Sequence, residues 1–345
     1  MQPRLLALKS AVPPYLLSQQ DVLERAARLF GCHKDIERLL KVFPNTGIER
    51  RFSCVPIDWY ERDHGWRERN ALYLENAVKL LETVTLALLE QAELEPDDLD
   101  AIVVTSTTGI ATPSLDALLV EKLKLRRDIR RLPIFGLGCA GGVIGLARAA
   151  ELVTARPGAR VLFLVVEFCA LTFRRNDHSK SNIIATALFG DGAAGAILST
   201  SGDGRPLEAA GEHTWPHSLD IMGWEIEDDG LKTRFSQSIP TLVANEFGTA
   251  LHAFLRKNDI PFDEIKGFAC HPGGAKVLDA LEAVFGVAEG GLCESRAVLR
   301  DFGNMSAATA LFVLERLNWK SGEGRILLSA MGPGFTAAFA TLGPK

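Results

Sequence analysis

The sequence contains no long apolar run, and this absence excludes a membrane-spanning protein. None of its uninterrupted apolar stretches approaches the roughly 18 residues that a spanning helix needs. The apolar run at residues 5–8 is too short for the core of a signal peptide, and Pro13 and Pro14 interrupt the residues after it. We therefore expect no membrane span and a cytoplasmic location.

Cysteine is scarce, and no two cysteines form a closely spaced pair. The chain has 6 cysteines among 345 residues, and none of them belongs to a Cys-x-x-Cys motif. Zinc sites and disulfide frameworks both depend on such spacing or on a much higher cysteine content. The sequence therefore predicts no metal site and reduced thiols.

Positive charge is too sparse and too dispersed for a nucleic-acid partner. The 38 lysines and arginines are outnumbered by 43 aspartates and glutamates, and basic runs are short, as at 126–131. A polynucleotide-binding surface would need a basic stripe or patch. The composition, 47% hydrophobic and 23% charged with 31 glycines, is typical of a packed α/β enzyme.

The first half of the chain alternates helical and strand patterns. Apolar residues at helical spacing occupy 72–95, and a short β-branched run follows at 99–105. Continuous apolar runs at 159–167 and 192–199 indicate strands that are covered on both faces. These patterns predict buried strands with helices packed against them.

The second half repeats this order of elements. A helix predicted around 241–257 precedes a strand at 265–271, and glycine-rich turns open helices of small residues at 139–152 and 304–317. We interpret the pattern as an internal duplication of one αβ unit, with residues 201–235 as the connection. The simpler alternative is the ordinary alternation of any α/β protein.

The glycine-rich segment 135–145 contains a candidate nucleophile, Cys139. It stands where a predicted strand gives way to a helix, and the positive end of a helix dipole favours the thiolate and lowers the thiol pKa. We therefore expect Cys139 to titrate below the range of a free thiol. A buried cysteine that only packs against glycines is the alternative.

Two residues of the second half complete a candidate catalytic set. His271 directly follows a predicted strand, at the edge where open α/β sheets bind ligands, and a Pro-Gly-Gly turn comes next. Asn304 lies between Gly303 and a run of small residues, and its alternative role is that of a helix N-cap. Together with Cys139 these residues suit thiolate attack on an acyl group, with the imidazolium stabilising the thiolate.

Five motifs then occur in one order along the chain: GCAGG (138–142), FGDGAAG (189–195), HPGG (271–274), GNMSAA (303–308) and GPG (332–334). In this order and at these separations the sequence resembles the type III polyketide synthases, the chalcone and stilbene synthase relatives, from about residue 3 to the end. Ketoacyl synthase III enzymes also use Cys, His and Asn, but HPGG and GNMS match the type III branch better.

The resemblance implies a thiolase-like, duplicated αβαβα fold of five layers. Residues 1–200 would form the half with the nucleophile, and residues 201–345 the half with His271 and Asn304. It also implies a homodimer that needs no metal and no bound organic cofactor. The substrates would be acyl-CoA and malonyl-CoA: a starter acyl group moves to Cys139, malonyl-CoA is decarboxylated, and the resulting enolate attacks the acyl thioester.

The resemblance also assigns residues around this centre. Phe189 corresponds to the aromatic gate between the coenzyme A tunnel and the acyl cavity. The cavity lining would comprise Thr107, Thr108, Thr112, Cys169, Thr172, Trp224, Thr233, Phe235, Ser306, Gly332, Pro333 and Gly334. Arg38, Lys41 and Lys276 correspond to positions near the coenzyme A phosphates, although Asn45 replaces the third basic residue of the family's N-terminal set. An ordinary solvated helix face is the alternative for these cations.

Several positions differ from the chalcone-forming members. Thr233 takes the place of a second gatekeeper phenylalanine, with Phe235 two residues later, and Cys169 and Thr112 replace threonine and methionine. The smaller residues would open space and favour fatty acyl starters and alkylpyrone or alkylresorcinol products. Trp224 is bulky where those enzymes are small, and the alternative is that it restricts elongation. The alternatives are a condensing enzyme that uses acyl carrier protein, a Cys-His-Asn thiol hydrolase, and a non-catalytic thiolase-fold subunit.

Overall fold

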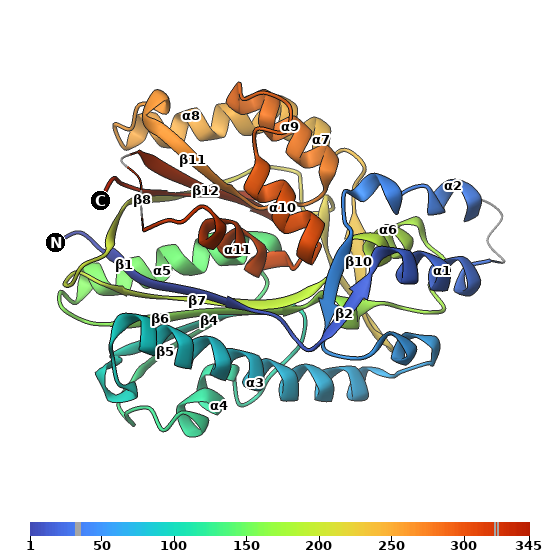
Figure 1. The fold of residues 1–345 in the computed structure, drawn as a ribbon, viewed down its shortest axis with the longest axis horizontal. Helices are drawn as coiled ribbons and strands as arrows, with labels where there is room; N and C mark the ends of the chain where they lie inside the picture. The colour runs from blue at the N-terminus through green and yellow to red at the C-terminus, as the bar shows by residue number, and fades with distance from the viewer. Residues whose placement is uncertain (32–35, 321, 323) are drawn as a thin grey trace.

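The computed structural model describes residues 1–31, 36–320, 322 and 324–345, and its elements stack in five layers (Figure 1). The central layer consists of α5 (Gly141–Ala155) and α11 (Thr309–Arg316), with strands on either side. The outer layers are α3 (Trp66–Ala92) with α4 (Leu115–Lys122), and α8 (Gly248–Lys257) with α9 (Ala275–Phe285). The predicted five-layer αβαβα order is confirmed.

Two sets of strands join into one sheet of 9 strands. The first set, in spatial order, is β5 (Arg130–Ile134), β4 (Ala101–Thr105), β6 (Val161–Phe168), β7 (Asp191–Ser199) and β1 (Arg4–Ala11). The second set is β8 (Arg205–Thr214), β13 (Thr336–Leu342), β12 (Arg325–Gly332) and β11 (Ile265–Cys270). The sets meet where Arg4 and Leu5 of β1 pair with Pro206 and Arg205 of β8.

The apolar runs of the sequence become the strands at the centre of this architecture. Every residue of β6 and of β7 is buried, as expected for strands covered by α3 on one face and by the central helices on the other. β4 runs parallel to β6, and β11 runs parallel to β12. The carboxyl ends of these strands therefore carry the residues that follow them, Ser106 onward and His271, to one edge of each set.

The expectation that residues 201–235 only connect the two halves is wrong. This segment contains β8, β9 (Met222–Glu227) and β10 (Gly230–Phe235). β8 pairs along its length with β13, whereas β9 and β10 form a separate two-stranded ladder. These strands carry charged residues and their outer ends are exposed, so they lack the apolar run that reveals a buried strand.

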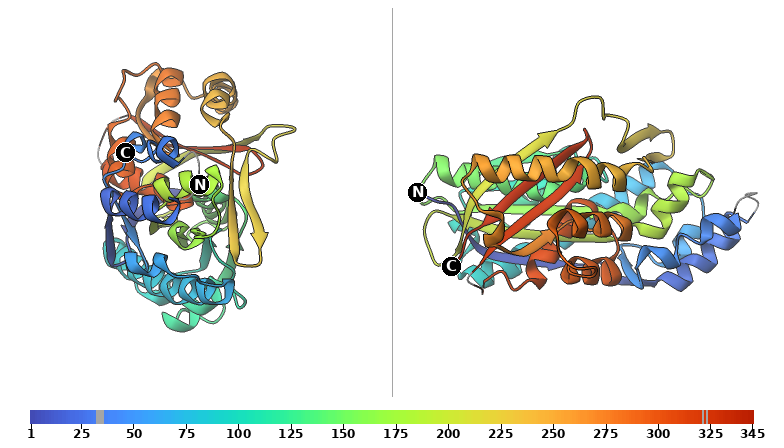
Figure 2. Two further views of the ribbon diagram at one scale, coloured as in Figure 1. Left: turned by 90° about the vertical axis from the view of Figure 1, so that its right-hand side faces the viewer. Right: turned by 90° about the horizontal axis from the view of Figure 1, so that it is seen from above.

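The remaining elements lie around the end of the molecule that holds the carboxyl ends of the parallel strands. A cap beside α6 (Lys180–Leu188) is built from β2 (Tyr15–Ser18), β3 (Arg50–Ser53), α1 (Gln19–Leu29) and α2 (Ile36–Leu40). The segment α7 (Ile239–Leu242) leads through a π-helical turn into α8, and α10 (Cys293–Phe302) precedes Asn304. Figure 2 shows the β9–β10 hairpin, in gold, along one side of the stacked layers.

Within the described part of the chain, one stretch is long and apolar enough to cross a membrane by length and composition alone. It is Gly138–Ala155, which contains α5, and 67% of it is buried inside the protein. A buried core helix passes the same test, and α5 is the central-layer helix between the two sets of strands.

Candidate active site

Cys139 lies in the short 3-10 turn Gly138–Ala140, directly before α5. Two close backbone contacts shape this turn. A Cβ on Gly138, whose φ is +48°, would lie 2.6 Å from Cδ of Pro333, and one on Gly332 would lie 2.4 Å from the carbonyl oxygen of Leu137. The GPG segment at the end of β12 therefore packs directly against the turn that carries Cys139.

His271 continues the line of β11 and points into the interior. Its backbone N–H donates to the carbonyl of Ser329 on β12 at 2.8 Å, and the residue is 4% exposed. Neither ring nitrogen has a hydrogen-bond partner among the described residues. Burial lowers the pKa of His271 to about 4, so the imidazole is uncharged at neutral pH.

Asn304 is held by its backbone and oriented by its side chain. Its N–H donates to the carbonyl of Leu188 at 2.8 Å, and its carbonyl accepts from the N–H of Gly190 at 3.0 Å. The Oδ1 atom accepts from the N–H of Ser306 at 2.8 Å. This bond turns Nδ2 toward the carbonyl of Gly273, 3.3 Å away, in the turn that follows His271.

A continuous set of contacts brings the three candidates together. The turn that carries Cys139 packs against the 3-10 turn Ser306–Ala308, the N–H of Ser306 donates to Asn304, and Asn304 donates to the carbonyl of Gly273, two residues after His271. The three junctions that carry the cysteine, histidine and asparagine are thus linked to one another, although they are far apart in the sequence.

The expected lowering of the Cys139 pKa is wrong. Burial raises the pKa of this thiol to about 12, even though a helix begins directly after it. The cost of burying a thiolate therefore outweighs the favourable helix dipole. With His271 uncharged as well, the resting site holds a neutral thiol and a neutral imidazole.

Glu167, at the end of β6, is not among the residues that the motifs indicate. Its Oε2 atom accepts from the N–H of Thr107 at 3.0 Å and from Oγ1 of Thr108 at 2.8 Å. Thr107 in turn accepts from the N–H of Gly138 at 3.2 Å through Oγ1. Burial raises the pKa of Glu167 to about 7. The one sequence signal was an acidic residue closing an otherwise apolar strand.

Three of the expected cavity residues line a largely apolar pocket. Cys169, Thr172 and Phe189 are part of its lining, and the cavity has a volume of about 60 Å³. Its other apolar lining comprises Leu17, Val22, Ala26, Leu29, Ile57, Ala170, Phe173 and Ala185. The pocket therefore extends from Phe189 toward α1 and presents mainly apolar side chains.

Phe189, the expected aromatic gate, lies in a cluster of aromatic rings. The ring of Phe189 lies 5.6 Å from that of Phe235 in a T-shaped contact and 5.9 Å from that of Trp224. Thr233 is buried and pairs with Trp224 across the β9–β10 ladder. Thr233 stands in place of the second gatekeeper phenylalanine of the chalcone-forming members. Trp224 and Phe235, on the same hairpin, supply the aromatic rings beside Phe189 instead.

A buried arginine that no motif indicates fixes the backbone of this gate. Arg51, on β3, donates to the carbonyls of Thr186 at 2.8 Å, Ala187 at 2.9 Å and Phe189 at 3.0 Å. These are carbonyls at the C-terminal end of α6, where a cation is favourable. Burial lowers the pKa of Arg51 to about 10, so it remains charged at neutral pH.

Some expected site residues lie apart from this centre. Thr112 is exposed, in the loop before α4. Arg38 and Lys41 are exposed on and just after α2, and Lys276 is exposed in the first turn of α9. The loop carrying Thr112 and the surface helices carrying the cations have no part in the buried contacts around Cys139.

Comparison with known proteins covers nearly the whole chain. Residues 2–202 match the N-terminal domain of chalcone and stilbene synthases, and residues 206–343 match their C-terminal domain. The chain is 37% identical over 351 residues to a putative chalcone synthase of Bacillus subtilis (strain 168), covering 96% of each. It is 37% identical over 348 residues to a 1,3,6,8-tetrahydroxynaphthalene synthase of Streptomyces peucetius subsp. caesius, covering 97% of this chain and 92% of the relative.

The architecture also matches a solved structure. The crystal structure of 1,3,6,8-tetrahydroxynaphthalene synthase from Streptomyces coelicolor A3(2), a bacterial type III polyketide synthase, has a TM-score of 0.95 at 29% identity. The match covers 99% of both chains.

Proposed function

Because the chain belongs to the chalcone and stilbene synthase family, we propose that Cys139, His271 and Asn304 are its catalytic residues. The protein is a type III polyketide synthase with a thiolase-like fold, and its reaction is a decarboxylative condensation of malonyl-CoA with an acyl-CoA. The observation that carries the residue assignment is the link between the three junctions: the Cys139 turn packs against Ser306–Ala308, and Asn304 bonds to Ser306 and to Gly273.

Loading of the starter uses Cys139 and His271. The sulfur of Cys139 attacks the thioester carbonyl of acyl-CoA while the neutral imidazole accepts the thiol proton as a general base. Collapse of the tetrahedral intermediate transfers the acyl group to sulfur and releases coenzyme A, whose thiolate takes the proton back from His271. The low pKa of His271 keeps the imidazole free to accept that proton.

Chain extension uses His271 and Asn304. Loss of carbon dioxide from malonyl-CoA leaves an enolate whose negative charge develops on the thioester oxygen. The Nδ2 group of Asn304 and the imidazole are the donors available to stabilise that oxygen in a buried site. The enolate carbon then attacks the acyl group on Cys139 and frees the thiolate for another cycle.

For the starter, we propose a fatty acyl-CoA, with alkylpyrone or alkylresorcinol products. The support is the apolar pocket that begins at Cys169 and Phe189 and runs toward α1. A second candidate is malonyl-CoA as its own starter, because one relative is a 1,3,6,8-tetrahydroxynaphthalene synthase, whose product has no alkyl chain.

Incubation of the protein with malonyl-CoA and a series of acyl-CoAs of increasing length, with products identified by mass, tests both candidates. Products that keep the added acyl chain support the fatty starter. Tetrahydroxynaphthalene formed equally well with and without acyl-CoA would favour the second candidate. If only acyl carrier protein thioesters react, the enzyme is of the ketoacyl synthase III type, and hydrolysis without condensation would indicate a thiol hydrolase.

We also propose that Arg38, Lys41 and Lys276 bind the coenzyme A phosphates, and that no metal or organic cofactor takes part. The three cations are exposed, as a phosphate contact at a tunnel mouth requires. Replacing Lys41 with Glu should raise the KM for acyl-CoA more than it changes kcat. Treatment with a chelating agent should leave the turnover rate unchanged.

We propose, in addition, that the protein is a homodimer and that it is located in the cytoplasm. Phe135 is 61% exposed and Ile110 is 47% exposed, and a second copy of this chain would cover such an apolar face. Analytical ultracentrifugation should give about twice the 37.5 kDa of one chain, and Phe135→Asp should shift the population toward monomer. The five cysteines that the structure describes are free, as in a reducing compartment, and Cys32 lies outside the described residues.

A further inference from the structure

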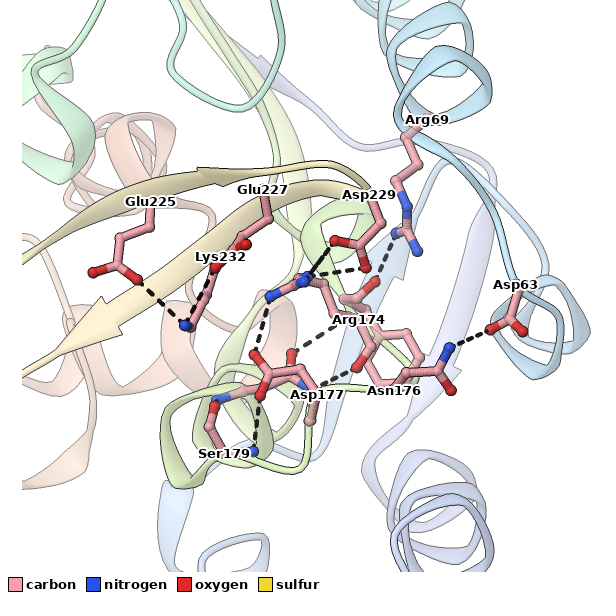
Figure 3. A network of polar contacts seen from close by, with 12 residues as sticks. Asp63, Arg69, Arg174, Asn176, Asp177, Ser179, Glu225, Glu227, Asp229 and Lys232 are labelled. Atoms are coloured by element: carbon pink, nitrogen blue, oxygen red, sulfur yellow. Dashed lines mark hydrogen bonds and ion pairs between the residues drawn. The ribbon is translucent and has the colours of Figure 1, made fainter.

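The β9–β10 hairpin is tied to the rest of the protein at its turn by a set of ion pairs (Figure 3). Asp229, in that turn, accepts from Nε of Arg174 at 2.9 and 3.1 Å and from Nη2 of Arg174 at 2.6 Å. Arg174 also faces Asp177 at 3.4 Å. The Arg174 side chain is 15% exposed and that of Asp229 is 42% exposed, so the pair lies at the boundary of the protein interior.

The turn also packs on the start of α3. A Cβ on Gly230 would lie 3.5 Å from the ring of Trp66 and 3.6 Å from Cδ of Arg69. Arg69 attracts the Asp229 carboxylate, which therefore faces two guanidinium groups. Burial is the largest single influence on the pKa of Asp229 and raises it, but the hydrogen bonds and charge of Arg174, together with smaller contributions that include Arg69, lower the pKa overall.

Arg174 follows Thr172 and Phe173, which line the apolar pocket, and it belongs to the segment that leads from them into α6 and on to Phe189. Its carbonyl accepts from Nδ2 of the buried Asn182 at 2.7 Å, and its N–H donates to Oδ1 of the same side chain at 3.3 Å. Asn182 lies in the first turn of α6, whose C-cap is Phe189. The carbonyls of Leu171 and Phe173, just before Arg174, each accept from Nη1 of Arg69 at 2.6 Å.

At the other end, the same hairpin carries Trp224 and Phe235 against Phe189. The two strands of the hairpin pair only with each other, so the main sheet does not fix their position. Contacts at the turn and at the gate therefore hold the hairpin in place. The ion pair of Arg174 and Asp229 is the polar part of that support.

We propose that Arg174 and Asp229 form a latch that holds the hairpin aromatics against Phe189 and thereby limits the length of acyl chain that the enzyme accepts. Both are positioning residues, because neither touches Cys139, His271 or Asn304 in the contacts of the site. The chain-length part of this inference rests on the proposed function, whereas the positioning of the hairpin does not.

Asp229→Asn and Arg174→Gln test the latch, singly and together. Hydrogen exchange of residues 222–235 should become about three- to tenfold faster in each single variant, as loss of a partly exposed charge pair predicts. The double variant should be no faster than the single ones, because the two residues act as a pair. With acyl-CoAs of increasing length, kcat/KM should shift by about the same factor toward longer starters.

Two matched controls separate the latch from a general effect of charge. Asp228→Asn removes the same charge from the adjacent, exposed position of the same turn. Lys232→Met removes an ion pair, with Glu225 at 3.3 Å and Glu227 at 3.4 Å, that lies entirely within the hairpin (Figure 3). Neither variant should change exchange at the gate or the preferred chain length, and malonyl-CoA decarboxylation should stay at the wild-type rate in all variants.

The outcomes are distinguishable. If the wild type condenses no acyl-CoA with malonyl-CoA, the proposed function is wrong, and hydrogen exchange alone then decides whether the hairpin is latched. If the wild type is active but Asp229→Asn changes neither exchange nor chain-length preference, the latch is wrong. Faster exchange with an unchanged preference would overturn the role in specificity.

Discussion

At the scale of single residues, the desolvation of the half-buried Cys139 and of the buried His271 sets the ionisation of the site. Burial raises the pKa of the thiol to about 12 and lowers that of the imidazole to about 4. Each group is therefore uncharged at neutral pH, and in the mechanism proposed here the proton moves from sulfur to nitrogen as the acyl group is attacked. The neutral state of both groups distinguishes the site from one with a preformed thiolate–imidazolium pair.

The pH dependence of Cys139 alkylation measures the ionisation of this thiol directly. For a thiol with a raised pKa, the thiolate fraction increases about tenfold per pH unit below that pKa, so labelling of Cys139 by iodoacetamide should rise steadily from pH 6 to 9 without a plateau. At pH 7 the exposed Cys293 should react faster than Cys139, as peptide masses would show. A plateau below pH 7, with Cys139 labelled first, would instead establish a preformed ion pair.

The two half-reactions should separate Asn304 from Cys139. Asn304→Ala should still acquire the starter acyl mass on Cys139, because its amide takes no part in proton removal from sulfur. It should lose malonyl-CoA decarboxylation by about 10²–10³-fold, the usual cost of deleting one such donor. Intact-protein mass follows loading, and acetyl-CoA release follows decarboxylation.

Cys139→Ala is the complementary variant. It should abolish acyl loading while retaining part of the decarboxylation, since His271 and Asn304 remain in place. If Asn304→Ala decarboxylates normally but fails at loading, then Asn304 orients the imidazole, and the division of labour proposed here is incorrect.

At the scale of elements, close approach of two helix starts joins the halves of the site. A Cβ on Gly142, in the first turn of α5, would lie only 2.1 Å from the carbonyl oxygen of Ala307, which precedes α11. The nucleophile and Asn304 each stand a few residues before these contacts. Glycine at 142 therefore sets the distance between the element that carries Cys139 and the one that carries Asn304.

Gly142→Ala should consequently destabilise the protein strongly. The added methyl group must displace backbone rather than a flexible side chain, and overpacking of this kind costs about 3 kcal/mol or more. Urea unfolding followed by circular dichroism measures the loss. A matched control is Gly65→Ser at the N-cap of α3, where a Cβ meets no atom within 4 Å and serine is a favourable residue; equal losses in both variants would contradict this account of Gly142.

At the scale of the whole molecule, two buried carboxyl groups couple stability to pH. Burial raises the pKa of Glu167 and of Asp191 to about 7. A carboxyl whose pKa is higher in the folded state stabilises that state when protonated, and this contribution is lost as pH rises through the folded pKa. His271 has a lowered pKa and opposes this trend only as pH falls below about 6.5.

The free energy of unfolding should therefore rise by about 1 kcal/mol when pH is lowered from 8 to 6.5. Glu167→Gln should reduce that gain by about half, because its amide does not titrate in this range. Thermal unfolding at several pH values gives the measurement, and Glu90→Gln, at an exposed position, is the control. A stability that is flat across this range in the wild type would refute the coupling.

The sequence by itself determined the family, the five-layer fold and the positions of the buried strands. Continuous apolar runs such as 159–167 specify strands whatever surrounds them, and the glycines before Cys139 and Asn304 mark close approaches of neighbouring segments. These signals are local in the chain. The charged strands β8, β9 and β10 lack such a signal, and the pattern of 201–235 therefore predicts only a connection.

Only the tertiary structure decided the ionisation of the site and the residues that support it. The pKa of Cys139 depends on how much protein covers its thiol, which is a property of packing and not of the helix that follows. Glu167, Arg51 and the Arg174–Asp229 pair act through partners more than 50 positions away in the sequence. Charged residues become recognisable as parts of a site only when folding brings these partners together, because their interactions depend on distance in space rather than on spacing along the chain.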